Sequence, residues 1–361
     1  MREGGRRHHR APGPAGRPDH VLVRRGRSAD FHRRRVSGRR GKDDDMQAVG
    51  RLVLIALAAI WGSNFLLVDV ALGGSDPAQI VAARLWLGGA ILLGCCLVLR
   101  SRMPRGWGIW LRLLVMGVLG QALPWLLFAW GQEQVSVSMA GIYNSVTPLA
   151  SLPVVWLLLR HKGSRGETTA SVLGFAGIVV LMAPWSDGSR SSLLGQLACL
   201  AGAVCYAIAY AYAKHLISNL GYSKVSLAAT QALVAGVLML VVAAPQLGHP
   251  VDATPAVVGS LVALGISTAV AFLLNYWLIA TVGPLQAGLA FYLMPIFAVI
   301  LGITVRGDVL HPHQIFGAAI VFAALVVQYA MDRRGAEPQA PVEAGESLGG
   351  TELPRRAEDR I

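Results

Sequence analysis

A few polar and charged side chains interrupt the long apolar runs of this 361-residue chain. Arg84 is the most costly of them, because a charge inside hydrocarbon is expensive and is usually kept for function. It follows Pro77 by seven residues, which is about 10 Å along a helix. Its guanidinium could bind a substrate carboxylate or make a gating contact. It could equally extend to the membrane surface or pair structurally with Asp69.

The other candidates are amides and aromatic residues near the middle of apolar segments. Tyr206 and Tyr210 are four residues apart and should share one helix face. Any one of the tyrosines could instead be a packed residue whose hydroxyl group is satisfied by a neighbour. The predicted substrate-binding set is Trp61, Asn64, Arg84, Gln121, Tyr143, Asn144, Tyr206, Tyr210, Asn275, Tyr276 and Tyr292.

Composition places these residues in a membrane. Hydrophobic residues make up 54% of the chain and charged residues 14%, whereas about a quarter of a soluble domain is charged. The four cysteines lie inside apolar runs without a CxxC pair, which predicts packed apolar side chains. His311 and His313 flank Pro312, but two histidines on a loop are weak evidence for a metal. Neither a metal nor a cofactor is expected.

Apolar runs of about 20 residues, the length that crosses a bilayer, occur ten times. Arginine and lysine follow the second, fourth and sixth runs, and the intervening loops are acidic or nearly neutral. Basic loops stay in the cytoplasm, so both termini are predicted to be cytoplasmic and the fold class to be all-α. The predicted spans are Val49–Val70, Ala78–Leu99, Ile109–Trp130, Val137–Leu159, Thr168–Trp185, Leu193–Ala213, Val225–Ala244, Ala256–Ala280, Leu285–Val305 and His313–Met331.

The two halves of the membrane region resemble each other. A shift of 147 residues aligns Trp130 with Trp277 and Pro148 with Pro295. More weakly, the segment from Ala58 matches the segment from Ala203. Five spans per half is an odd number, so the second copy must cross the membrane in the opposite sense. The sequence therefore predicts two inverted five-helix repeats, 46–185 and 193–331, with a substrate site between them.

Pro148 and Pro295 are predicted to be helix kinks, because proline removes one backbone hydrogen bond and frees a carbonyl group. In lipid the freed carbonyl must be satisfied by neighbours or by water in a cavity. The recurrence of the proline favours a pair of bent helices that line a central cavity. A bend that merely helps the helices to pack is the alternative.

The ends of the chain have a different composition. Residues 1–45 contain 14 Lys or Arg against 6 Asp or Glu, with many Gly and Pro, which predicts a disordered basic extension. It could bind anionic lipid or nucleic acid, but we favour an extension without function, with Met46 as the true start, and no nucleic-acid partner. Residues 332–361 are predicted to be a disordered cytoplasmic tail.

Four segments together resemble the EamA family of the drug/metabolite transporter superfamily. They are AAIWGSNFLLVDVAL from Ala58, AARLWLGGAILL from Ala82, AGIYNSVTPLASLPVVWLLL from Ala140 and AGLAFYLMPIFAVILG from Ala287. The resemblance implies ten helices in two repeats, a bacterial cytoplasmic membrane, and transport of small metabolites such as amino acids. The chain departs from the family at Gly307–Asp308, where Gly-Glu is common, and in the longer, more basic loop after the fourth span.

The sequence hypothesis is therefore a secondary transporter that exports a small metabolite by alternating access. A multidrug or cationic-compound exporter of the same fold is the alternative, and an intramembrane enzyme is disfavoured because no catalytic motif lies in any span. The expected partners are a small-molecule substrate and the lipid bilayer. A coupling proton, a counter-substrate and a homodimer are left open.

Overall fold

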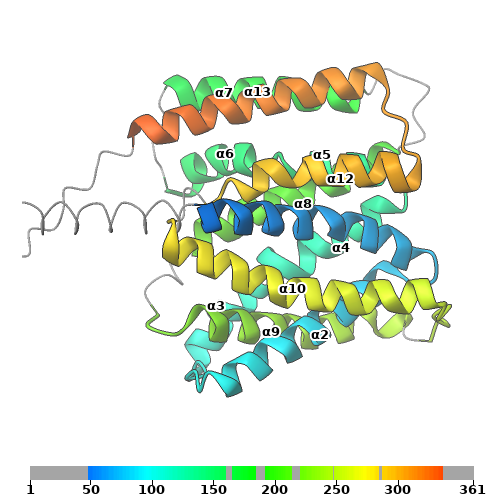
Figure 1. Ribbon diagram of the computed structural model, residues 1–361, viewed down its shortest axis with the longest axis vertical. Helices are drawn as coiled ribbons and strands as arrows, with labels where there is room; N and C mark the ends of the chain where they lie inside the picture. Colours follow the sequence, from blue (N-terminus) through cyan, green and yellow to red (C-terminus); the bar gives the residue numbers. More distant parts are fainter. Residues whose placement is uncertain are drawn as a thin grey trace, which may run out of the picture.

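The computed structural model describes residues 48–159, 165–183, 192–213, 220–246, 248–283 and 287–335. Within these ranges the chain consists of helices joined by short connections, and it contains no strand (Figure 1). The predicted extension 1–45 lies outside the described residues, as do Trp185 and Leu285 at the ends of two predicted spans.

In the part of the chain that the structure describes, seven helices are long and apolar enough to cross a bilayer. They are Ala48–Leu72 (here the first helix), Pro77–Val98, Trp107–Gln132, Leu193–Tyr212, Lys224–Gln246, Pro255–Thr281 and Pro312–Met331. Gly166–Met182 and Ala290–Arg306 are shorter apolar helices.

The labelled elements divide some of these spans further. They are α2 (Pro77–Val98), α3 (Trp107–Gly117), η1 (Val118–Ala122), α4 (Leu123–Gln132), α5 (Val137–Asn144), α6 (Thr147–Leu159), α7 (Arg165–Met182), α8 (Leu193–Tyr212), α9 (Lys224–Ala243), η3 (Ala244–Gln246), α10 (Pro255–Thr281), α12 (Ala290–Arg306) and α13 (Pro312–Gly335). Because α13 continues to Gly335, the predicted tail at 332–361 begins too early.

The predicted fourth span is two helices rather than one bent helix. α5 ends at Asn144, a turn follows at Ser145 and Val146, and α6 begins at Thr147. Pro148 therefore lies in the first turn of α6, where proline is well tolerated because its missing N–H would have no helical partner. Pro295 instead lies inside α12 and is buried. The helix therefore breaks just before Pro148, whereas α12 continues through Pro295, so the two prolines are not equivalent in the structure and a kink at each stays a prediction.

The third span contains a π-helical turn, η1, with a local cause. Pro124 has no N–H to donate to the carbonyl group four residues earlier, and its ring would clash with that carbonyl. The N–H of Leu123 donates to the carbonyl of Val118, five residues back. π turns inside α-helices occur frequently at functional sites, and Gln121 lies in this one.

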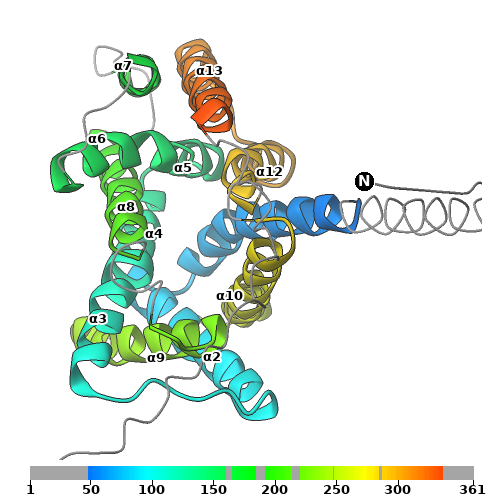
Figure 2. The ribbon, with the colours of Figure 1, turned by 90° about the vertical axis from the view of Figure 1, so that its left-hand side faces the viewer.

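Several helices of the first half pack against the helix in the same position of the second half. α2 packs against α9, α5 against α12, and α7 against α13. α7 and α13 lie side by side at one edge of the bundle (Figures 1 and 2). Glycines permit this contact: a Cβ on Gly177 would lie 2.9 Å from the backbone nitrogen of Val321. Small residues bring membrane helices together in this way.

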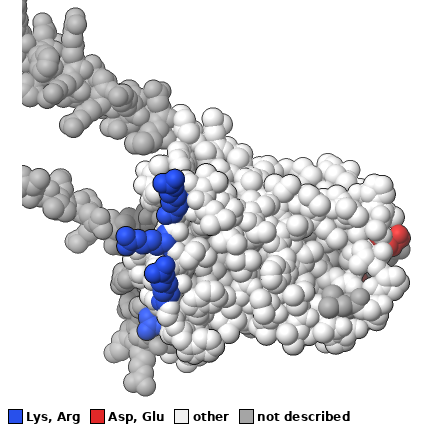
Figure 3. All heavy atoms as spheres, turned by 90° about the horizontal axis from the view of Figure 1, so that it is seen from below, with Lys and Arg blue, Asp and Glu red and all other residues white. Residues whose placement is uncertain are grey.

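The two ends of the bundle carry opposite charges, as one face of the molecule illustrates (Figure 3). The basic end is defined by the exposed residues Arg51, Arg100, Arg102, Arg105, Arg112 and Lys224. The acidic end is defined by Asp69, Asp76, Glu133, Asp252 and Asp308. The first helix runs from the basic end at Arg51 to the acidic end at Asp69, and α2 returns from Asp76 to Arg100.

Candidate functional site

A cavity of about 480 Å³ lies among the helices of both halves. Ligand sites in proteins typically measure about 300–1,000 Å³. The first helix, α2, η1, α4, α5, α8, α9, α10 and α12 all contribute side chains to its wall. Nine of the predicted site residues line it: Trp61, Asn64, Arg84, Gln121, Asn144, Tyr206, Tyr210, Asn275 and Tyr276.

The remaining predicted residues lie away from the cavity wall. Tyr143 is fully buried, and its hydroxyl group donates to Gln196 Oε1 at 3.0 Å. The Tyr292 ring packs edge-on against the Tyr329 ring, with 6.3 Å between centroids. Pro148 and Pro295 are also absent from the lining. Tyr143 and Tyr292 have structural contacts, so the cavity does not support them as substrate contacts, and the two prolines, predicted as kinks, do not line it.

Arg84 is held in the cavity wall by neutral partners. Its Nε donates to Thr268 Oγ1 at 2.8 Å, and its Nη2 donates to the amide oxygen of Asn64 at 2.9 Å. The guanidinium carbon lies 3.8 Å from the centre of the Trp125 ring, a favourable cation–π distance. An arginine has five N–H donors, and only these two have acceptors among the described residues. Three donors thus remain for a ligand.

The orientation of the Asn64 amide follows from its neighbours. A guanidinium group only donates hydrogen bonds, so the amide oxygen must face Arg84. The amide nitrogen then donates to Ser267 Oγ at 2.7 Å and to the carbonyl of Ile60 at 3.2 Å. Asn64 therefore connects the first helix to α2 and α10 and fixes one side of the guanidinium.

Asp69 does not pair with Arg84. Its carboxylate lies 2.6 Å from Nε of Arg306, at the acidic end of α12. This overturns the alternative in which Asp69 neutralises Arg84. The described residues that line the cavity include Arg84 and Lys224 but no aspartate or glutamate, so the wall favours negative charge in a ligand.

Aromatic rings form much of the remaining wall. Trp61 and Phe291 lie 4.7 Å apart between ring centres, and Tyr210 meets Phe291 edge-on at 5.6 Å. Phe128 lies 6.3 Å from Tyr206. Such surfaces contact apolar side chains and flat rings without demanding one hydrogen-bonding pattern.

Sequence reasoning missed most of the apolar lining and several polar residues. Helical spacing could have revealed part of it, because Gln121, Trp125, Phe128 and Gln132 follow one another on one face of the third span. Most of the other missed residues are apolar or lie near a helix end, but Gln231 and Thr268 are polar residues inside their helices and could have been found in the same way as Gln121. The other missed residues include Phe65, Lys224, Gln231, Thr268, Phe272, Phe291 and Met294.

The lining itself repeats between the two halves. With the shift of 147 residues, Arg84 corresponds to Gln231 and Gln121 to Thr268, and all four line the cavity. Further lining pairs at this shift are Trp125 with Phe272, Phe128 with Asn275, Gln132 with Ile279 and Asn144 with Phe291. With a shift of 145 residues, Trp61 pairs with Tyr206, Asn64 with Ala209, Phe65 with Tyr210 and Val68 with Ala213. Both halves therefore build the wall with equivalent positions.

Exposure indicates where the cavity opens. Toward the acidic end, Val68 and Gln132 are 7% and 5% exposed. Toward the basic end, Tyr210 is 43% exposed and Lys224 is also exposed. The cavity therefore opens at the basic end.

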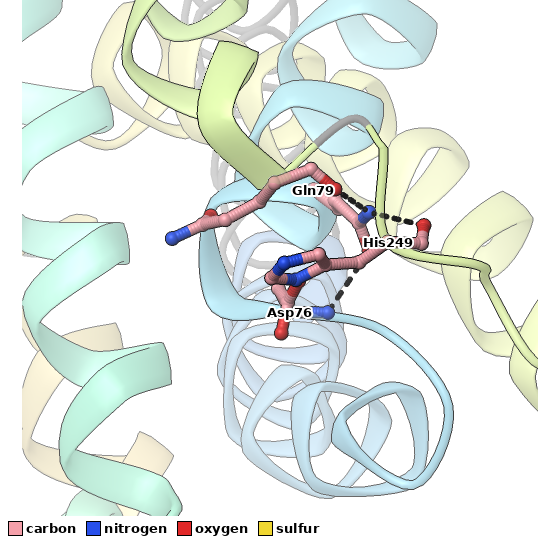
Figure 4. Close-up of polar contacts among 4 residues, drawn as sticks. Asp76, Gln79 and His249 are labelled. Carbon is pink, nitrogen blue, oxygen red and sulfur yellow. Dashed lines mark hydrogen bonds and ion pairs between the residues drawn. The ribbon is translucent and has the colours of Figure 1, made fainter.

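Polar contacts tie the helices together at the acidic end. The start of α2 contacts the connection between α9 and α10, where His249 Nδ1 lies 2.8 Å from Asp76 Oδ2 (Figure 4). Gln79 Nε2 donates to the carbonyl groups of Gln246 at 2.7 Å and His249 at 3.3 Å. The backbone N–H of Asp252 donates to the carbonyl of Gly74 at 2.9 Å. These contacts join the two halves.

A second set of contacts involves the end of α12. Arg306 pairs with Asp69 of the first helix. Asp308 Oδ2 accepts a hydrogen bond of 2.9 Å from the backbone N–H of Ser138, in the first turn of α5. A carboxylate is favourable at a helix N-terminus because the helix dipole is positive there. Two nearly adjacent residues thus connect α12 to the first helix and to α5.

Known proteins resemble the chain across the region that forms the cavity. The Escherichia coli (strain K12) protein named "Uncharacterized inner membrane transporter YedA" is 26% identical over 76% of this chain and 88% of its own length. A protein of Streptantibioticus cattleyicolor named "Probable terminal-alkyne amino-acid exporter" is 23% identical over 78% of this chain and 93% of its own length.

A solved crystal structure confirms the fold. It matches with a TM-score of 0.55 at 19% identity, over 80% of this chain and 99% of that chain. The model of the EamA-like transporter family matches residues 48–183 and again residues 193–329. The two matches coincide with the two halves that surround the cavity. The chain therefore belongs to the EamA-like transporter family.

Proposed function

We infer that this membrane transporter is a secondary carrier that exports a small carboxylate-bearing metabolite, an amino acid or a related compound, by alternating access. The observation that carries the proposal is Arg84, in the wall of a cavity shared by both halves, because three of its N–H donors have no acceptor among the described residues. A planar guanidinium with adjacent free donors fits a carboxylate in a bidentate manner.

Ten membrane crossings are part of this proposal. Seven long helices, the two shorter apolar helices and the α5–α6 pair supply them. The pairing of α2 with α9, α5 with α12 and α7 with α13 supports two inverted repeats around a pseudo-two-fold axis. The positive-inside rule places the basic end in the cytoplasm, and hence both termini as well.

The different states of the two ends support alternating access. The cavity opens at the basic end, whereas ion pairs and hydrogen bonds join the halves at the acidic end. In the proposed topology this is the state in which a cytoplasmic substrate enters. Release would require these contacts to separate. The exporter of Streptantibioticus cattleyicolor among the relatives supports this direction.

The lining also bears on the class of substrate. Arg84 and Lys224 attract an anionic group and repel cations, which disfavours the alternative of a cationic-drug exporter. The aromatic wall around Phe291 suits an apolar or aromatic side chain. With no carboxylate among the described lining residues, exchange for a counter-substrate fits the cavity better than coupling to a proton.

Flux measurements test the proposal. Overexpression should enrich one or a few amino-acid-like compounds in the growth medium, as measured by metabolite profiling. Purified protein in liposomes should then exchange the radiolabelled compound, with empty vesicles and Arg84→Gln vesicles as controls. Accumulation of a chemically altered product without flux would identify an enzyme instead and refute the carrier.

A further inference from the structure

Two amides in the cavity wall have polar atoms that find no hydrogen-bond partner among the described residues, although such atoms are normally paired. Gln121 is 1% exposed, and both its Oε1 and its Nε2 lack a partner. Asn144 is 5% exposed; its Oδ1 lacks a partner, and its Nδ2 contacts only the sulfur of Met294, at 3.5 Å. Buried amides without partners are rare, and each unsatisfied group costs about 1–3 kcal/mol.

Both residues belong to the cavity lining, and their unpartnered atoms are buried in this conformation. Gln121 lies in the π turn η1 of the third span. Asn144 is the last residue of α5, before the turn that separates α5 from α6. The terminal torsion of a glutamine is soft, so the Gln121 amide can turn toward the cavity without moving its helix.

The two amides lie within about one helical turn of the depth of Arg84. Arg84 follows the acidic-end start of α2 by seven residues, and Asn144 follows the start of α5 by seven residues, about 10 Å in each case. Gln121 precedes the acidic-end terminus of α4 by eleven residues, or about 16 Å. The unpartnered amide oxygens and the free guanidinium donors therefore lie within about one helical turn of one another in depth.

We propose that Gln121 and Asn144 form the subsite for the substrate's amino group, and that this subsite selects amino acids over hydroxy acids and unsubstituted acids. The inference rests on the proposed function, because Arg84 must hold the carboxylate. The amide oxygens Gln121 Oε1 and Asn144 Oδ1 accept from the ammonium group, which has three N–H donors and no acceptor. A hydroxyl group supplies one donor, and a methylene group leaves both oxygens unsatisfied.

Binding of three matched compounds tests the subsite. L-phenylalanine, L-phenyllactate and 3-phenylpropanoate share the carboxylate and the ring, and carry an ammonium, a hydroxyl and a hydrogen on the same carbon. Titration calorimetry on the purified full-length protein should give the tightest binding for phenylalanine. Gln121→Leu should weaken phenylalanine binding by about 10- to 100-fold and change 3-phenylpropanoate binding by less than about twofold.

The controls separate this inference from the proposed function. Gln328→Leu removes a buried amide outside the cavity and should leave all three affinities unchanged. Arg84→Gln should weaken all three compounds alike. If Gln121→Leu does not fold, Gln121→Met and Asn144→Leu replace it.

Equal affinities of the three compounds for the wild type, or an equal loss of all three in the Gln121 and Asn144 variants, would overturn the amino-group subsite and leave the carboxylate site standing. Failure of the wild type to bind any of the three would overturn both.

Discussion

Substitution of Arg84 gives the most informative test of how the cavity binds its substrate. Arg84→Gln removes the charge and the free fork of donors, whereas Arg84→Lys keeps the charge but loses the planar fork. Hydrogen bonds to charged groups contribute about 1.5–3 kcal/mol each, so a bidentate carboxylate contact is worth at least about 3 kcal/mol. Since 1.4 kcal/mol is tenfold in affinity, Arg84→Gln should raise the KM for the carboxylate substrate about 100-fold.

Arg84→Lys should lose about one such bond and raise KM about tenfold. Thr268→Val removes the acceptor of Arg84 Nε while the cation stays in the cavity, so its effect should be smaller than that of either Arg84 variant. The assay is initial flux in liposomes at several substrate concentrations, with equal amounts of folded protein confirmed by size-exclusion chromatography. A folded Arg84→Gln variant with unchanged KM would refute the carboxylate role.

Three further substitutions probe the scaffold around the cavity. Asp69→Asn breaks the ion pair with the half-exposed Arg306. Because this pair is worth about 0.5–1 kcal/mol, the substitution should raise the labelling rate of cysteines near the acidic end a few-fold, and exchanging the two charges should restore the wild-type labelling rate. An unaltered labelling rate would exclude a gating role for the pair. Gly62→Ala places a Cβ 2.6 Å from the carbonyl of Met294 and should lower the thermal midpoint of unfolding. Gly94 has open space around it, so Gly94→Ala should leave the midpoint unchanged. Equal midpoints for the two variants would contradict the close packing of the first helix against α12. Asp308→Asn removes the negative charge at the start of α5 and should lower the stability of the fold by about 0.3–1 kcal/mol. The thermal midpoint of unfolding should therefore fall at low salt only. A loss of stability that persists at high salt would contradict a helix-dipole interaction.

The sequence predicted the long helices well because their length is imposed by hydrocarbon thickness. The first helix, predicted at Val49–Val70, spans Ala48–Leu72, and α10, predicted at Ala256–Ala280, spans Pro255–Thr281. The rule that polar groups in apolar spans are retained for function found Arg84, Asn64 and seven other lining residues.

The sequence could not locate features that depend on contacts between distant segments. Whether Asp69 meets Arg84 or Arg306 depends on how the first helix rotates against α12, which hydrophobicity does not encode. Tyr143 is polar and central, yet its hydroxyl group is satisfied by Gln196. The position of the break before Pro148 also depends on tertiary packing, because proline is tolerated both in a kink and in a first turn.

The central claim is that the two ends of one cavity open in alternation, and paired distance measurements test it most directly. Spin labels at Gly73 and Val309 report on the acidic end, and labels at Arg112 and Ala280 on the basic end; all four positions are exposed. On addition of the transported substrate, the account predicts that part of the acidic-end distance distribution lengthens while the basic-end distribution shortens by a matching fraction. Lengthening at both ends together, or no change at either end while flux proceeds, would contradict it.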